Sequence, residues 1–296
     1  SIHEIKKRWL SAWESAVTLW SPYVQLRQPL LCETSQMAEQ EGLSSSFAMI
    51  RLTDYSVVVS MAQVIKLGLE EFPMEILAHE AGHHVYCPAD LTDLGRVIGR
   101  IQGAMPGYEQ HAPMIANLYE DLLINDRLFR EHHLKMDKVY EKVKGGYADK
   151  LWEFYMRTYE ILWALPAQRL TVGPVDTETE GDAILASRIV RNFSREWIRG
   201  SGEFASICYR YLLESGTPQS KADIWLDAAE PGDGKTIPSG LAQGDPDEAA
   251  PGSLPGELRK PGEGNGSGSG SSYREPYQYG QILRAMGIDL SEQEIA

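Results

Sequence analysis

The segment PMEILAHEAGHHVYCP (residues 73–88) decides the predicted fold, because it combines helix boundaries, apolar residues and charged groups. Pro73 is tolerated in the first turn of a helix and Pro88 ends one, so the segment predicts a helix over residues 73–86. Its apolar side chains place this helix in a protein core; they are Ile76, Leu77, Ala81 and Val85. Charged and polar groups on such a helix need partners.

The same helix carries the pattern His79-Glu80-Ala81-Gly82-His83. Each helical residue advances by about 100°, so His83 lies about 40° from His79 and both imidazoles can reach one ion. Neutral imidazole suits zinc, and a zinc ion with an open position lowers the pKa of a bound water to about 7. Glu80 can take the proton of that water as a general base. The pattern therefore predicts a catalytic zinc site.

Two neighbours of the pattern are interpreted as structural. Cys87 follows His83 at i+4, and a thiolate ligand there would give zinc three ligands from one helix. Free cysteine is among the most buried residue types, which favours a packing role for Cys87. His84 points away from the metal face and is expected to pack.

The two histidines need a third protein ligand from elsewhere in the chain. The histidine and carboxylate candidates are His111, His132, His133, Glu120, Asp121 and Asp126. On a predicted helix, Asn117, Glu120 and Asp121 share an arc of about 100° with two apolar residues. Adjacent carboxylates on such a face favour a functional site over a solvated acidic surface.

The motif HEAGHH followed by a helix with NLYED (residues 117–121) resembles the gluzincin-type metallopeptidases, whose HExxH site is completed by a Glu of a second helix. It most resembles predicted bacterial metallopeptidases associated with von Willebrand factor A (VWA) domains and MoxR-type ATPases, which have an Asn-x-x-Glu-Asp signature here. The resemblance covers residues 55–130 and, weakly, the tail from residue 273. It implies a zincin-like metallopeptidase core with Glu120 as the third zinc ligand. Asp121 and Asn117 would then lie beside the ligands, with Asp121 orienting an imidazole.

The resemblance also implies partners, namely a VWA-domain protein and a MoxR-type ATPase in a larger system. In gluzincins an edge strand above the metal pairs with extended substrate. Residues 55–61 could form that strand, or equally an interior strand with no substrate role. A donor to the tetrahedral oxyanion is also needed, and four candidates stay open: Tyr119, Tyr147, His111 and Arg127.

Hydrophobic periodicity predicts a mainly α fold with a small N-terminal β-sheet (α+β). Apolar residues at helical spacing predict a helix over residues 2–20, and β-rich runs at 46–52 and 55–61 predict a two-stranded unit. A short helix follows at 62–69. Beyond the helix at 73–86 only helices are predicted, at 91–103, 112–131, 135–144, 148–164, 178–198 and 202–214.

Composition divides the chain into three parts. Residues 1–215 form the predicted metallopeptidase domain. Residues 216–272 are rich in Gly, Pro, Ser and acidic residues, which predicts a flexible linker. Residues 273–296 regain aromatic and apolar residues, so they are expected to dock or to begin a further domain.

The net charge and composition of the chain limit its possible partners. Its 296 residues carry a formal net charge of −14, which argues against nucleic acid or an anionic membrane surface as a main partner. The chain has no apolar run of membrane-spanning length and no signal-peptide pattern. Its three cysteines are widely spaced, which is no disulfide framework and fits a reducing cytoplasm.

The sequence supports two classes of function. The first is a zinc-dependent peptidase that hydrolyses a protein or peptide substrate, with Glu80 as general base. The alternative is a metal-stabilised protein-interaction module without catalysis. Glu80 separates the two readings, because a purely structural metal site has no use for a base beside the metal.

Overall fold

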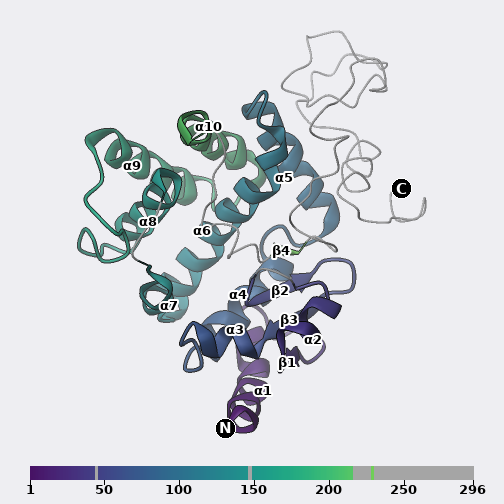
Figure 1. The fold of residues 1–296 in the computed structure, drawn as a ribbon. Coiled ribbons are helices and arrows are strands. Elements are labelled where there is room, and N and C mark those ends of the chain that lie inside the picture. Colours follow the sequence, from purple (N-terminus) through teal and green to yellow (C-terminus); the bar gives the residue numbers. More distant parts are fainter. Residues whose placement is uncertain (44–45, 146–148, 216–227, 230–296) are drawn as a thin grey trace, which may run out of the picture.

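The computed structural model describes residues 1–43, 46–145, 149–215 and 228–229. In these residues the chain is mainly helical with a small β-sheet, as the hydrophobic pattern predicts. Figure 1 shows the sheet and the N-terminal helices at one end of the molecule and the later helices at the other. The helix of residues 73–85 lies where these two parts meet.

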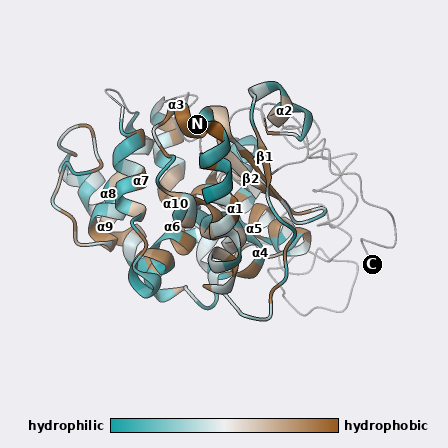
Figure 2. Cartoon of the chain, turned by 90° about the horizontal axis from the view of Figure 1, so that it is seen from below, coloured by the Kyte–Doolittle hydropathy of each residue, from teal (hydrophilic) through white to brown (hydrophobic). Residues whose placement is uncertain are grey.

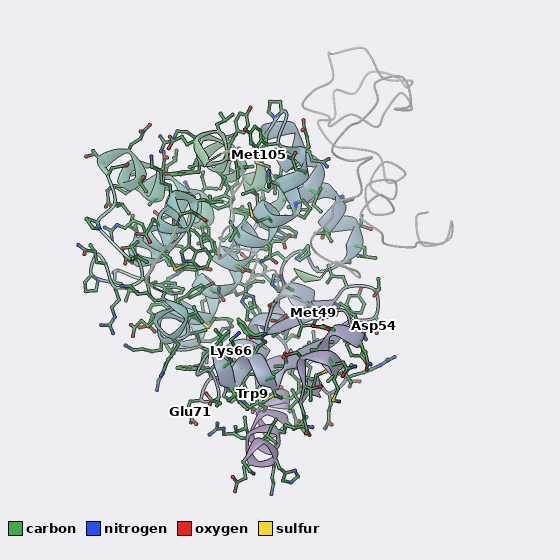
Figure 3. All side chains as sticks on the ribbon, viewed as in Figure 1. Trp9, Met49, Asp54, Lys66, Glu71 and Met105 are labelled. Carbon is green, nitrogen blue, oxygen red and sulfur yellow. The ribbon has the colours of Figure 1, made fainter. Side chains whose placement is uncertain are left out.

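The N-terminal part contains α1 (Ile2–Thr18), β1 (Leu30–Cys32), α2 (Ser35–Gln40), β2 (Ala48–Arg51), β3 (Ser56–Ser60) and α3 (Met61–Lys66). Helix α1 begins with a capping box, in which Ser1 and Glu4 satisfy each other's backbone N–H groups. Trp9, labelled in Figure 3, is fully buried, and its indole N–H donates to the Glu70 carbonyl over 3.2 Å. This contact anchors α1 to the loop before the 73–85 helix.

The sheet of the described residues has the strand order β1-β3-β2-β4, where β4 is Ala228–Ala229. Strand β3 runs parallel to β1 and antiparallel to β2. Ile50 and Val57 face the main core, whereas Met49 and Val58 pack in a second apolar cluster with Ala38 of α2. Figure 2 shows this concentration of hydrophobic residues on the strands. Both faces of the sheet are therefore covered.

Strand β3 settles one alternative left open by the sequence. Residues 55–61 were expected to form either an edge strand above the metal or an interior strand. In the structure β3 pairs on both sides, with β1 and with β2, so the interior alternative is confirmed. Any strand that offers a free edge in this sheet must be another one.

Helix α4 (Pro73–Val85) begins as the sequence predicts, with Pro73 in its first turn. It is buried along most of its length and packs against α1, β2 and α6 (Ala112–His132). Such a helix needs apolar contacts on several faces, which explains its mixed pattern of small and apolar residues. It connects the sheet to the helical part.

The helical part contains α5 (Leu91–Ala104), the short 3₁₀ helix η1 (Glu109–His111), α6, α7 (Met136–Val143), α8 (Lys150–Leu162), α9 (Thr177–Asn192) and α10 (Trp197–Ser215). Three aspartates accept a hydrogen bond from the backbone of the first turn that they precede, and so fix helix starts: Asp90, Asp149 and Asp176. Met105 at the end of α5 marks this part in Figure 3.

The prediction of one helix over residues 178–198 is wrong at its end, because α9 stops at Asn192 and α10 begins at Trp197. The break lets α10 fold back closely, since a Cβ atom at Gly200 would lie 2.8 Å from the Phe193 Cβ atom. Strand β1 and helix α2 were not predicted, because each is too short to show a hydrophobic period.

The predicted linker at 216–272 and the docking segment at 273–296 lie outside the described residues, except that residues 228–229 form β4. None of the helices in the described part of the chain has the length and apolar character needed to cross a membrane.

Candidate metal centre

Helix α4 places the two histidines of the HExxH pattern side by side. His79 and His83 are one turn apart, and their Nε2 atoms lie 3.2 Å from each other. The side chains are almost completely buried, with exposed fractions of 6% for His79 and 0% for His83. The two rings are nearly perpendicular, with an interplanar angle of 85°.

Asp121 on α6 completes the cluster. Its Oδ1 atom lies 3.5 Å from His79 Nε2 and 3.3 Å from His83 Nε2. Ligand atoms bound at about 2.0–2.1 Å at the corners of a tetrahedron lie about 3.3 Å apart. The three distances therefore match one face of a tetrahedral metal site. Among the described residues, this buried group of His79, His83 and Asp121 could hold a metal ion.

The hydrogen bonds of the two imidazoles direct their Nε2 lone pairs toward the centre of this group. His79 Nδ1 lies 2.7 Å from Asn125 Oδ1, and His83 Nδ1 lies 3.1 Å from the Cys87 carbonyl. Both partners accept hydrogen bonds, so each Nδ1 carries the proton and each neutral ring leaves Nε2 unprotonated. Three acceptor atoms then face one another without a proton between them, and a bound cation would remove this repulsion.

Charge at the cluster favours the ionised form of Asp121. Burial raises the pKa of this carboxyl, whereas a positive charge beside it, on His79 and His83 or on a cation bound between them, lowers the pKa below its ordinary value. Within the described residues no donor hydrogen-bonds Oδ1, the atom that faces the histidines. The other oxygen, Oδ2, accepts a hydrogen bond of 3.2 Å from Asn117. An ionised, oriented carboxylate is the form that binds a metal.

Asn125 contacts the candidate metal centre and was not predicted from the sequence. It lies one turn after Asp121, and its carboxamide oxygen holds His79. Its Nδ2 group donates to the hydroxyls of Tyr140 and Tyr159, each over 2.9 Å. Asn117, Asp121 and Asn125 thus form an i, i+4, i+8 row on α6, a spacing that could have revealed Asn125 once Asp121 was taken as the ligand.

The structure does not place Glu120 in the cluster, in contrast to the role that the resemblance implies for it. Its carboxylate is fully buried, and within the described residues neither oxygen has a hydrogen-bond partner. Burial, then the charges of Asp121 and Asp93, raise its pKa well above the ordinary value. Adjacent residues on a helix point about 100° apart, so only one of Glu120 and Asp121 can face the histidines. That residue is Asp121.

Cys87 lies next to the site but outside the cluster, as its structural interpretation requires. The thiol is fully buried, and its Sγ donates to the Glu120 backbone carbonyl over 3.7 Å. Burial, followed by the charges of Glu120 and Asp121, raises the pKa of the thiol well above its usual value. A neutral thiol is a poor metal ligand. His84 also packs away from the cluster, with its ring 4.1 Å from that of Tyr55.

Glu80 lies beside the cluster in a small, mainly apolar pocket. The pocket has a volume of about 10 Å³, close to the space needed by one water molecule. It is lined by Phe47, Ile76, His79, Glu80, Asn125, Met136, Val139 and Tyr140. Glu80 is fully buried. A buried carboxylate and an imidazole of the candidate metal centre thus line the same pocket.

The other ligand candidates have different surroundings. Asp126 pairs with Arg130 over 2.8 Å, while His111 and His133 cap the two ends of α6. His132 packs near Trp20. All four belong to the described residues, and none of them is in the metal-binding group.

The oxyanion candidates also lie away from the pocket. The Tyr119 hydroxyl donates to the Trp197 carbonyl over 2.9 Å, and Arg127 stacks on the rings of Trp20 and Tyr86. Neither these residues nor His111 line the pocket. Tyr147 lies outside the described residues. The phenol that does line the pocket is Tyr140.

Comparisons with protein families, with curated proteins and with solved structures find no match to this chain.

Proposed function

We propose that this chain is a zinc-dependent peptidase with a zincin-like core, in which His79, His83 and Asp121 hold the metal. The observation that carries the proposal is the convergence of three buried acceptor atoms, at mutual distances of 3.2, 3.3 and 3.5 Å, beside the Glu80 pocket. Two imidazoles and one carboxylate are a common ligand set of catalytic zinc, which keeps its fourth position open.

In this proposal each residue of the site has a separate role in the hydrolysis. Zinc, when bound, polarises the substrate carbonyl and lowers the pKa of water. Glu80 accepts the proton of the attacking water and delivers it to the leaving amine. Ile76 and Val139 line the pocket beside Glu80, and this apolar lining strengthens the electrostatic interactions of the Glu80 carboxylate. Asn125 and Asn117 hold His79 and Asp121 in position.

The Glu80→Gln variant tests the catalytic part of this proposal. The substitution keeps the shape of the side chain and removes the base without removing a ligand. We expect one zinc per molecule in both proteins by mass spectrometry of metals, and hydrolysis of a peptide library by the wild type alone. Equal hydrolysis rates in the two proteins would rule out Glu80 as the base.

The alternative is a metal-stabilised protein-interaction module without catalysis. The narrow pocket around Glu80 favours this reading, because the space is about that of one water molecule. Under this alternative, zinc binds and stabilises the protein, but the wild type cleaves no member of the library under any condition. A VWA-domain protein and a MoxR-type ATPase stay predicted partners under both readings, and co-purification with the native protein tests them.

A further inference from the structure

A second and larger cavity lies beside the start of α4. It has a volume of about 650 Å³, and α4 and α7 both contribute to its lining. Glu75 lines it from the first turns of α4, and Lys135, Lys138 and Lys142 line it from α7 and the residue that caps this helix. Glu71, labelled in Figure 3, also belongs to the lining and marks the position of the cavity.

This larger cavity and the Glu80 pocket are neighbours on the same two helices. On α4, Glu75 precedes His79 by four residues, which is about one turn and a rise of about 6 Å. On α7, Val139 and Tyr140 line the Glu80 pocket, whereas the lysines line the larger cavity. Measured along α4, the larger cavity therefore lies about one helical turn from the candidate metal centre.

The carboxylates that line the larger cavity already have partners. Glu71 pairs with Arg8 over 2.8 Å, and Glu141 pairs with Arg169 over 2.5 Å. Glu75 is almost completely buried, and it accepts a hydrogen bond of 3.1 Å from a backbone N–H at the start of α7. The negative charge of the lining is thus largely compensated by groups of the protein itself.

Two of the three lysines have no such compensation. Lys135, Lys138 and Lys142 fall within an arc of about 60° around the helix axis. Lys138 pairs with Glu141 over 3.2 Å. Among the residues that the structure describes, the exposed ammonium groups of Lys135 and Lys142 have no ion-pair or hydrogen-bond partner. In a chain with a formal net charge of −14, this leaves a local positive charge at one cavity, which attracts anionic groups.

We propose that the larger cavity selects acidic peptide substrates, whose carboxylate side chains pair with Lys135 and Lys142. The proposal rests on the peptidase function proposed above. An extended peptide advances by about 3.3 Å per residue, so the selected acidic residue lies about two to four residues from the bond at the metal. Charge complementarity of this kind raises the association rate and suppresses the binding of peptides with the wrong charge.

Charge reversal of the two lysines tests this selection. The test variant is Lys135→Glu with Lys142→Glu. The matched control is Arg188→Glu with Arg195→Glu, which changes the net charge equally at exposed residues outside the cavity. Both doubles are made in the full chain with Glu80→Gln and with zinc added, so that no peptide is cleaved. Circular dichroism and the melting temperature confirm that both variants fold.

The probes are two fluorescein-labelled, alanine-rich peptides that are identical except for central glutamates in one and glutamines in the other. Binding is measured by fluorescence anisotropy. An exposed ion pair changes an affinity by up to about fivefold, so we expect two pairs to favour the glutamate peptide by about tenfold. The preference should persist in the arginine control, disappear in the lysine variant and weaken as salt is added. Equal affinity for both peptides in the parent protein, or an unchanged preference in the lysine variant, would overturn the proposal.

Cleavage of the same peptides by the protein with Glu80 intact separates this proposal from the peptidase function. Preferential binding of the glutamate peptide through Lys135 and Lys142, without hydrolysis of any peptide, supports the acidic-peptide site and contradicts the catalysis. Hydrolysis of both peptides with equal kcat/KM supports the catalysis and contradicts the selection by the two lysines.

Discussion

At the scale of single residues, the partner of His79 is a carboxamide. A carboxylate in this position would raise the basicity of the imidazole, whereas an amide oxygen fixes the tautomer with a weaker effect. The Asn125 Nδ2 group donates to the hydroxyls of Tyr140 and Tyr159, which leaves Oδ1 as the atom that faces His79 Nδ1. The hydroxyls of Tyr140 and Tyr155 each lie 3.0 Å from the Tyr159 hydroxyl, so this buried network is continuous.

Asn125→Ala should therefore weaken zinc binding about 10–100-fold, because His79 loses the partner that orients it. Asn125→Asp should restore the affinity, since a carboxylate also accepts the Nδ1 proton. Competition with a chromogenic chelator measures both values. A purely structural role would instead lower the melting temperature of Asn125→Ala while its zinc affinity stayed that of the wild type.

Substitution of Asp121 and of Glu120 tests which of the two carboxylates binds zinc. Asp121→Asn should abolish tight zinc binding, because the ligand oxygen that faces the histidines loses its charge. Glu120→Gln should retain zinc, since Glu120 lies outside the metal-binding group. Zinc titration of the two purified variants decides between the residues. The reverse ranking would restore Glu120 as the ligand.

The sequence predicted two members of the candidate metal-binding group, His79 and His83, but not the third, Asp121. His79, Glu80 and His83 follow from spacing on one helix, which needs no knowledge of tertiary structure. The choice between Glu120 and Asp121 depends on how α6 is rotated about its axis when it packs against α4. Tertiary packing fixes that rotation, so the rotation could not be predicted from this sequence alone.

At the scale of elements, the approach of α4 to α6 depends on Gly82. A Cβ atom at this position would lie 2.6 Å from Trp20 Cζ2 and 2.8 Å from Ile124 Cγ2, closer than atoms can pack. Trp20 is itself held by a hydrogen bond from its Nε1 to the Ala78 carbonyl over 2.6 Å. Glycine therefore lets α4 lie close enough for His83 to meet Asp121.

Gly82→Ala should destabilise the protein by about 1–3 kcal/mol and weaken zinc binding, because α4 must move away from α6. Gly181→Ala is the matched control, since a Cβ atom at this position in α9 meets no atom within 4 Å. It should stabilise the protein by about 0.5–1 kcal/mol through helix propensity. Urea unfolding measures both changes, and destabilisation of equal size in the two variants would exclude the packing argument.

Helices long enough to show a repeated hydrophobic pattern were predictable from the sequence, whereas the shortest elements were not. Helices α4 and α6 have clear boundaries in the sequence because prolines lie at their first turns. Strand β1 has three residues, which is too few to distinguish a strand from a loop by alternation. The position of β3 inside the sheet depends on this unpredicted strand. The hydrophobic pattern within each segment therefore predicted the helices, whereas the strand order of the sheet depends on pairing between segments that are distant in the sequence.

At the scale of the whole molecule, the candidate metal centre links two parts of the fold. Helix α4 packs against α1 and β2 in the N-terminal part, while α6 packs against α5 and α10 in the helical part. His79 and His83 come from α4, and Asp121 comes from α6. A bound ion would therefore hold these parts together, and its binding free energy would add to the free energy of unfolding.

Removal of the metal should accordingly lower the melting temperature of the whole domain. At a free zinc concentration of a thousand times Kd, binding contributes about 4 kcal/mol to stability, which corresponds to a shift on the order of 10 °C. Differential scanning calorimetry with and without a chelator measures the shift, and added zinc should reverse it. His83→Ala is the control, because it lacks a ligand and should melt at one temperature in both conditions. A chelator effect of the same size in His83→Ala would show that stabilising zinc binds elsewhere.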